Sequence, residues 1–238
     1  MLKMEGISCI YRAGMVETHA LRELDVEIQA GEFVSITGPS GSGKTTLLNI
    51  AGLLEEASTG TYFLDGVNVS HLNDSQRSRI RNQKIGFVFQ SFNLIPDLNL
   101  FDNVDVPLRY RRFSLGERKR RIEGALEQVG LLSRAKHLPA QLSGGQQQRV
   151  AIARALAGEP KLILADEPTG NLDSFMARQI MDLLEYINKQ GTTIIMVTHA
   201  PELARRTQRN IQMLDGQLIA GDETPPPASK LDNDYAAA

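Results

Sequence analysis

The sequence predicts an α/β protein with a parallel sheet and a helical insertion, and three observations favour this fold class. Residues 33–37 form a short apolar stretch that runs through a glycine-rich loop into a helical pattern. Residues 162–165 and 193–197 are continuously apolar, as expected for parallel strands buried on both faces. Residues 92–138 carry little strand pattern, and apolar residues recur there at helical spacing. We therefore expect a core of alternating strands and helices, with the insertion at about residues 91–160.

The N-terminal elements follow from local patterns. Residues 7–11 and 24–28 partly alternate between apolar and polar side chains, which predicts two short strands separated by a breaker at Arg12–Gly14. Residues 44–54, directly after the glycine-rich loop, are rich in Leu, Ile and Ala and predict a helix. The succession of strand, glycine loop and helix is the first well-defined unit of the chain.

Three further elements are predicted before the insertion. Residues 60–69 suggest a hairpin that turns at Asp65–Gly66. Residues 75–84 are polar and basic, as in a surface helix, and residues 85–89 form a second apolar strand that ends at Gln90.

Length and composition exclude several classes of protein. The 238 residues allow one domain or two closely joined ones, and 42% hydrophobic with 23% charged residues is typical of a globular chain. A net charge of −2 provides no general attraction for nucleic acid. Cys9 is the single cysteine, which excludes an intrachain disulfide and a cysteine-based zinc site. With no signal-peptide pattern and no apolar window of membrane-spanning length, we expect a soluble, cytoplasmic protein.

Two compositional features lie outside the predicted strands. Seven Lys and Arg residues fall between Arg109 and Arg121, and we expect them to coat the solvated face of helices. The alternative, a contact with nucleic acid or phospholipid, lacks the interleaved aromatic residues that single-strand binding uses. Residues 222–238, with three consecutive prolines, predict a flexible tail.

The glycine-rich loop matches G-x-x-x-x-G-K-[ST] in full. Glycines let backbone N–H groups converge on phosphate oxygens, and the following helix turns its positive end toward the same anion. Lys44 is expected to reach the β- and γ-phosphates, and the Thr45 hydroxyl to ligate Mg²⁺. The predicted nucleotide-binding residues here are Gly38, Pro39, Ser40, Gly41, Ser42, Gly43, Lys44, Thr45 and Thr46.

Two carboxylates follow the apolar strand at residues 162–165. Because ligands bind at the carboxyl edge of an open α/β sheet, Asp166 is expected to hold Mg²⁺ and Glu167 to orient or deprotonate water. An ordinary acidic turn is the alternative. Gln90 and His199 also follow strands, so Gln90 can supply an amide oxygen to Mg²⁺ and His199 a hydrogen bond to the γ-phosphate.

A second anion-binding pattern occurs at Leu142–Gln146, where glycines and a serine precede a helix. One chain with one phosphate loop has no second nucleotide for this segment. Two copies that face each other would solve this, because each Ser143–Gln146 segment would close over the γ-phosphate of the partner.

These motifs, in this order, resemble the ATP-binding cassette (ABC) ATPases, and the resemblance covers residues 2–221. It implies a P-loop NTPase fold, with a RecA-like core and an antiparallel β subdomain at about residues 1–90 and 161–221, and a helical subdomain at about 91–160. It also implies a head-to-tail dimer of two identical chains with two ATP molecules between them, together with Mg²⁺.

The resemblance assigns further residues. Tyr11 matches the aromatic residue that stacks on adenine, and Asp173 the loop that passes between the two sites. An aspartate commonly follows His199 in the family, and Ala200 stands there in this chain. The implied catalytic residues are Glu167, His199 and Lys44, the metal ligands are Thr45, Gln90 and Asp166, and the signature contacts come from Ser143, Gly144, Gly145 and Gln146.

Within the family, residues 87–96, 142–149 and 165–173 resemble the lipoprotein-release and macrolide-export ATPases (the LolD and MacB type). Antimicrobial-peptide exporters and the cell-division pair share much of this pattern. The resemblance implies an ATPase subunit at the inner face of the cell membrane that drives a separate permease, for export or extraction of lipoprotein, lipid, peptide or drug. The apolar residues Phe92, Leu94, Ile95 and Leu98 would face that permease or pack the subdomain's own core.

Two alternatives are weighed against transport. An ATPase that only transmits force, for example to a cell-wall hydrolase complex, would use the same ATP-hydrolysing cassette, so the sequence does not separate it from a transport ATPase. A soluble ABC ATPase acting on nucleic acid is disfavoured, because the chain has no heptad run for a coiled coil and only one cassette, and no nucleic-acid partner is expected.

Overall fold

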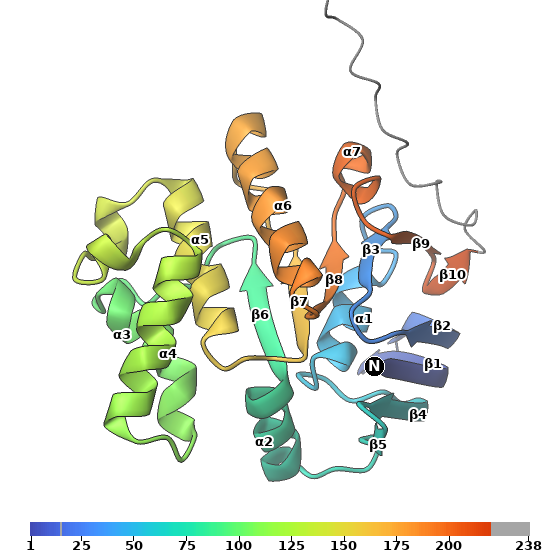
Figure 1. The fold of residues 1–238 in the computed structure, drawn as a ribbon. Coiled ribbons are helices and arrows are strands. Elements are labelled where there is room, and N and C mark those ends of the chain that lie inside the picture. The colour runs from blue at the N-terminus through green and yellow to red at the C-terminus, as the bar shows by residue number, and fades with distance from the viewer. Residues whose placement is uncertain (15, 220–238) are drawn as a thin grey trace, which may run out of the picture.

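The structure, a computed structural model, describes residues 1–14 and 16–219, and the predicted tail at 222–238 lies outside these residues. The chain forms two sheets with helices packed around them (Figure 1). The strands are β1 (Leu2–Ala13), β2 (Val16–Ile28), β3 (Phe33–Thr37), β4 (Thr59–Leu64), β5 (Val67–Asn68), β6 (Ile85–Phe89), β7 (Leu162–Asp166), β8 (Thr193–Val197), β9 (Arg209–Leu214) and β10 (Gln217–Ile219). The α-helices are α1 (Lys44–Ala51), α2 (Asp74–Lys84), α3 (Leu100–Asp105), α4 (Leu115–Gln128), α5 (Gly144–Leu156), α6 (Ser174–Lys189) and α7 (Pro201–Ala204), and short 3₁₀ helices span Val106–Tyr110, Leu132–Arg134 and Pro139–Gln141.

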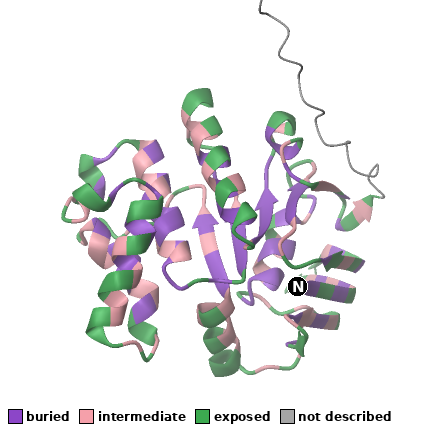
Figure 2. Cartoon of the chain, viewed as in Figure 1, coloured by how far each residue is buried: buried purple, intermediate pink, exposed green. Residues whose placement is uncertain are grey.

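The larger sheet has the strand order β10-β9-β3-β8-β7-β6, and all its strand pairs except β10–β9 are parallel. Both faces of its central strands are buried (Figure 2). Ile36, Leu164 and Val197 belong to the apolar core that includes α1 and the second sheet, whereas Ile163 and Met196 belong to the core that includes α5 and α6. Burial on both sides explains why these strands are continuously apolar in sequence. The predicted α/β fold with a parallel sheet is confirmed.

The smaller sheet is antiparallel, with the order β2-β1-β4-β5. Its first two strands are much longer than the short strands predicted at residues 7–11 and 24–28. The register of β1 against β2 shifts between Met4 and Ile7 and again near Cys9, and such irregularities interrupt the period-two alternation on which the prediction depended. The predicted turn at Asp65–Gly66 is confirmed, since both residues have positive φ, 52° and 76°, as a tight hairpin turn requires.

The predicted helices are present with adjusted ends. Helix α1 ends three residues before the predicted limit, because Leu53 has a left-handed backbone with φ 55°. Helix α2 begins at Asp74 and is capped by Asn73, whose side chain accepts a hydrogen bond from Gln76 N–H in a capping box. The helices α3, α4 and α5 pack around their own part of the core on one side of the larger sheet (Figure 1). The division of residues 1–221 at about 91 and 160 stays a prediction.

The expectation that the basic run coats a solvated face is wrong for three of its members. Arg118 pairs with Asp105, which is 3% exposed and needs a positive partner in that environment. The guanidinium of Arg111 donates to the Gly158 carbonyl at 2.6 Å, and Arg121 pairs with Glu159 at 2.9 Å. These arginines therefore hold the helical part of the molecule together.

Among residues 1–14 and 16–219, no helix has the length and apolar character needed to cross a lipid bilayer.

Candidate nucleotide-binding site

The predicted site residues follow neighbouring strands of the larger sheet. Ile36 pairs with Val197, Val197 with Asp166, and Asp166 with Phe89, so the carboxyl ends of β3, β8, β7 and β6 lie in register at one edge. The residues that follow these strands are the phosphate loop, His199, Glu167 and Gln90. The sheet thus brings together groups that are up to about 160 residues apart in sequence.

The phosphate loop wraps tightly against β2 and β9. Gly38, Gly41 and Gly43 have positive φ values of 152°, 79° and 98°. A Cβ at Gly43 would lie 2.5 Å from the Ala20 carbonyl oxygen, and one at Gly38 would lie 2.1 Å from that of Met213. The loop conformation therefore requires glycine at both positions, for backbone angle and for space.

Lys44 spans the loop from the first turn of α1. Its ammonium donates to the carbonyl oxygens of Gly38 at 2.9 Å and Pro39 at 2.7 Å. Burial lowers the pKa of Lys44, although the carboxylates of Glu167 and Asp166 oppose this shift. The charge thus lies inside the concave side of the loop, where phosphate oxygens can replace the two carbonyls as acceptors.

The acidic pair lies beside this loop. Glu167 has a left-handed backbone with φ 47°, and its Oε1 lies 2.7 Å from His199 Nε2. Burial raises the pKa of Asp166, and the neighbouring charge of Glu167 adds to the shift, while Lys44 and His199 oppose it. Two adjacent carboxylates, one of them substantially desolvated, favour a bound cation at this point.

The donor set at this edge fits Mg²⁺. Thr45 contributes a hydroxyl, Gln90 an amide oxygen and Asp166 a carboxylate, all hard oxygen ligands. Among the described residues, no cluster of three or more His, Cys, Asp or Glu is arranged to hold a metal ion.

Gln90 has partners that sequence reasoning missed. Its Nε2 donates to Asn171 Oδ1 at 3.3 Å, and Asn171 Nδ2 donates back to the Gln90 carbonyl at 3.1 Å. A Cβ at Gly170 would lie 2.6 Å from Gln90 Nε2, so glycine leaves the space that the amide occupies. The only sequence signal for these two residues is their place a few positions after the acidic pair.

The Ser143–Gln146 segment forms the start of α5. Ser143 Oγ accepts from Gln146 N–H at 3.4 Å, and Gln146 Oε1 accepts from Ser143 N–H at 3.1 Å. Gly145 packs against α6, since a Cβ there would lie 2.8 Å from Met176 Sδ. Within residues 1–14 and 16–219, no hydrogen bond or ion pair joins this segment to the phosphate loop. The structure therefore does not bring the two anion-binding segments together through direct polar contacts in one chain.

Two other predicted residues have simpler surroundings. Tyr11, on β1, is 42% exposed, and its hydroxyl lies 3.5 Å from Thr46 Oγ1 at the start of α1. Its ring is therefore close to the phosphate loop and accessible. Asp173 caps α6, where its carboxylate accepts from the N–H groups of Phe175 and Met176 at 2.9 Å each.

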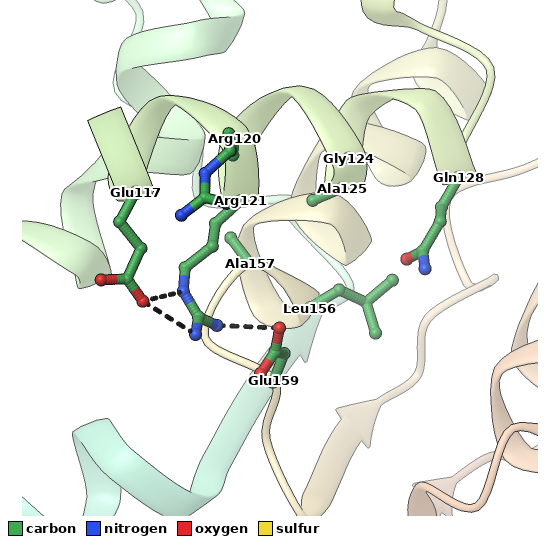
Figure 3. Close-up of a pocket in the computed structure, with 9 residues that line it drawn as sticks. All are labelled: Glu117, Arg120, Arg121, Gly124, Ala125, Gln128, Leu156, Ala157 and Glu159. Carbon is green, nitrogen blue, oxygen red and sulfur yellow. Dashed lines mark hydrogen bonds and ion pairs between the residues drawn. The ribbon is translucent and has the colours of Figure 1, made fainter. Parts of the chain in front are cut away.

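A surface pocket of about 330 Å³ lies elsewhere, between α4 and the end of α5 (Figure 3). Arg121 points into this region, but its guanidinium is paired with both Glu117 and Glu159. These carboxylates neutralise the guanidinium of Arg121. Arg120 also lines the pocket, but the lining contains no glycine-rich loop at a helix start like the one around Lys44. The glycine-rich loop, the buried Lys44 and the acidic pair occur together at the edge of the sheet, which makes that edge the candidate nucleotide site.

A strand, a glycine loop with a buried lysine and a neighbouring acidic strand end define the class of P-loop nucleotide hydrolases. The sequence matches the family described as "ABC transporter" over residues 21–170. It is 48% identical over 219 residues to the "Uncharacterized ABC transporter ATP-binding protein YknY" of Bacillus subtilis, covering 92% of this chain and 95% of that protein. The chain belongs to the ABC transporter family, and it is an ATP-binding ABC ATPase.

Two more comparisons refine this assignment. The chain is 41% identical to the "Macrolide export ATP-binding/permease protein MacB" of Escherichia coli, matching 99% of this chain but 38% of that protein. A solved dimer of the ATP-binding cassette MJ0796, in a post-hydrolysis state bound to ADP and Pi, superposes with a TM-score of 0.83 at 46% identity, covering 92% of this chain and 96% of that one. The predicted ABC fold and the similarity to macrolide-export ATPases are confirmed.

Proposed function

We propose that this ATPase is the nucleotide-binding subunit of a membrane complex, in which two copies of the chain hold two ATP molecules between them. The observation that supports this most strongly is the separation of two anion-binding segments on one chain. The phosphate loop is complete at the sheet edge, while Ser143 begins α5 with an exposed side chain and no polar contact to that loop among the described residues. A partner chain would bring its Ser143–Gln146 segment to the open side of the triphosphate. The dimeric form of the MJ0796 cassette supports the same arrangement.

The proposed reaction is hydrolysis of the γ-phosphate by water. Phosphate oxygens replace the carbonyls of Gly38 and Pro39 as acceptors for Lys44. The γ-phosphate also offers His199 a stronger acceptor, which releases Glu167 from its 2.7 Å contact with His199 Nε2. Glu167 is then free to orient the attacking water, and Lys44 offsets charge that develops on the phosphate.

The remaining site residues act by binding. Thr45, Gln90 and Asp166 would hold Mg²⁺, which when bound neutralises phosphate charge. For Gln90 this requires that its amide leave Asn171. The Tyr11 ring would stack on the adenine, a contact worth about 1–3 kcal/mol by analogy with base stacking.

We propose that a separate permease carries the cargo, for export or extraction of a lipoprotein, lipid, peptide or drug, and that the subunit works at the inner face of the membrane. The name of MacB joins an ATP-binding and a permease part, which supports a permease as the partner. Of the apolar residues that follow Gln90, Leu94 packs against the helical core, while Ile95 is 40% exposed and available for docking.

Replacing Glu167 by glutamine tests the chemistry. We expect Glu167→Gln to bind ATP as the wild type does, to hydrolyse it about 10²–10⁴-fold more slowly, and to accumulate as a dimer with ATP. Hydrolysis is measured by phosphate release and dimerisation by light scattering. Glu123→Gln, at a half-buried position on α4 where its carboxylate lies near Lys119, is the matched control and should remain unchanged. Wild-type turnover in Glu167→Gln would show that Glu167 does not orient the attacking water.

A pull-down from solubilised membranes, with Glu167→Gln and ATP, tests the partner. A stoichiometric polytopic membrane protein would support transport or force transmission. Recovery of ribosomes, DNA or only soluble proteins would overturn the permease proposal and leave the ATPase assignment intact.

A further inference from the structure

Arg154, near the end of α5, contacts the turn that follows Gln90. Its Nη2 donates to the Phe92 carbonyl at 2.8 Å, and its Nη1 donates to the carbonyl of Asn93. The flat guanidinium fork suits two adjacent carbonyl acceptors, which a single ammonium group cannot match in the same way. We refer to residues 91–93 as the Gln90 turn.

The backbone of the Gln90 turn is strained. Phe92 and Asn93 both have left-handed backbones, with φ values of 61° and 50°. Two consecutive left-handed residues other than glycine persist only where their surroundings hold them. Backbone hydrogen bonds from the N–H groups of Phe92 and Asn93 hold part of the turn. Arg154 donates to the carbonyl of each of these residues, so a side chain of α5 adds to what holds the turn.

Two more contacts join α5 to the same region. Gln148 is fully buried, and its Nε2 donates to the Phe89 carbonyl at 3.3 Å and to the Pro168 carbonyl at 2.6 Å. The Phe92 ring lies close enough to Gly144 that a Cβ there would be 3.6 Å from it. Helix α5 is therefore joined to the chain on both sides of Gln90, before it at Phe89 and after it at the Gln90 turn.

Gln90 itself also contacts the loop that follows β7. It is hydrogen-bonded to Asn171 at 3.3 Å through its side-chain Nε2 and at 3.1 Å through its backbone carbonyl, and the side-chain bond must open if the amide is to reach Mg²⁺. Arg154 donates to Phe92 and Asn93 and not to the phosphate loop at residues 38–46, so we expect its replacement to leave that loop unchanged.

We propose that Arg154 is a positioning residue for Gln90. By fixing the Gln90 turn to α5, it makes the strand end that carries Gln90 and the helix that begins after Ser143 move as one body when ATP binds. Hydrolysis then becomes possible only when the strand end that carries Gln90 and helix α5 have both reached their positions. This inference rests on the proposed role of Gln90 and adds to it the residue that sets the position of its turn.

The test compares Arg154→Met with Arg149→Met in the full chain. Arg149 lies on the same helix but donates to the Val129 carbonyl and to Gln179, away from the Gln90 turn. We expect Arg154→Met to lower kcat about tenfold, with the affinity for a fluorescent ATP analogue unchanged within about twofold. Arg149→Met should change neither quantity.

Hydrogen exchange gives a readout that a purely structural role would not change. ATP should slow exchange at residues 38–46 in the wild type and in both variants. The response to ATP at residues 89–99 should be present in the wild type and Arg149→Met, and absent in Arg154→Met. If Arg154→Met fails to fold, Arg154→Lys, which keeps the charge and one donor, should fold and show an intermediate kcat.

Wild-type kcat in the Arg154 variants, or equal losses of kcat and nucleotide affinity, would overturn the proposal. Gln90→Ala separates this failure from that of the proposed function. If Gln90→Ala hydrolyses ATP at the wild-type rate, the role of Gln90 itself is wrong. If Gln90→Ala is slow while Arg154→Met is not, only the role of Arg154 is wrong.

Discussion

Replacing Gly43 by alanine separates two reasons for glycine in the phosphate loop. Gly43 and Gly41 both have positive φ, 98° and 79°. A Cβ at Gly43 would lie 2.5 Å from the Ala20 carbonyl oxygen and 3.0 Å from Leu21 Cδ2, whereas a Cβ at Gly41 would have no neighbour within 4 Å. Both substitutions therefore carry the cost of the backbone angle, and only Gly43→Ala also carries a collision with β2.

The magnitudes follow from these two contributions. A left-handed backbone costs an ordinary residue about 1–2 kcal/mol. The collision with a fixed carbonyl adds about 1–3 kcal/mol, since β2 must shift to admit the methyl group. In a chain of this size each kcal/mol lowers the melting temperature by about 2–4 °C. Gly43→Ala should therefore melt at least about 2 °C below Gly41→Ala, and both below the wild type.

The assay is thermal unfolding without nucleotide, followed by circular dichroism for the wild type and both variants under identical conditions. Leaving ATP out restricts the measurement to the loop and its packing against β2, because phosphate contacts play no part. Equal melting temperatures for Gly41→Ala and Gly43→Ala would refute the argument that close approach to Ala20 requires glycine at position 43.

Two further predictions concern charged residues. Lys44→Ala should remain folded but lose affinity for a fluorescent ATP analogue by at least about tenfold, because it removes the cation inside the phosphate loop; wild-type affinity would contradict the loop assignment. Hydrogen bonds from Lys161 and Lys84 hold the pKa of Asp65 below its ordinary value. Its stabilisation is therefore present above about pH 4 and lost as the pH falls through the lowered pKa, so the melting temperature of the wild type should fall more on acidification than that of Asp65→Asn.

Much of this molecule could be predicted from local sequence. The strand, glycine loop and helix around Lys44 are contiguous, and the acidic pair directly follows an apolar run. The parallel strands are identifiable because burial on both faces leaves them few polar positions. The hairpin at Asp65–Gly66 is signalled by residues that tolerate positive φ.

Other features depended on contacts between distant segments. The lengths of β1 and β2 were underestimated because irregular register near Ile7 breaks the alternation that identifies strands. Composition predicted a solvated basic face, yet Arg118 pairs with the buried Asp105, and nothing in the local sequence of either residue indicates the other. A charge pattern indicates how many charges there are, whereas their burial depends on which elements pack together.

The candidate site divides in the same way. The residue types that can bind a triphosphate are encoded locally, because the loop of residues 38–45 and the helix after it bind an anion with their own backbone N–H groups. The contacts of Gln90 with Asn171, and of Arg154 with the Gln90 turn, join residues 61 to 81 positions apart. Such contacts arise only when the sheet places strand ends side by side and α5 packs beside them, because side chains this distant in sequence meet only through the packing of the whole fold.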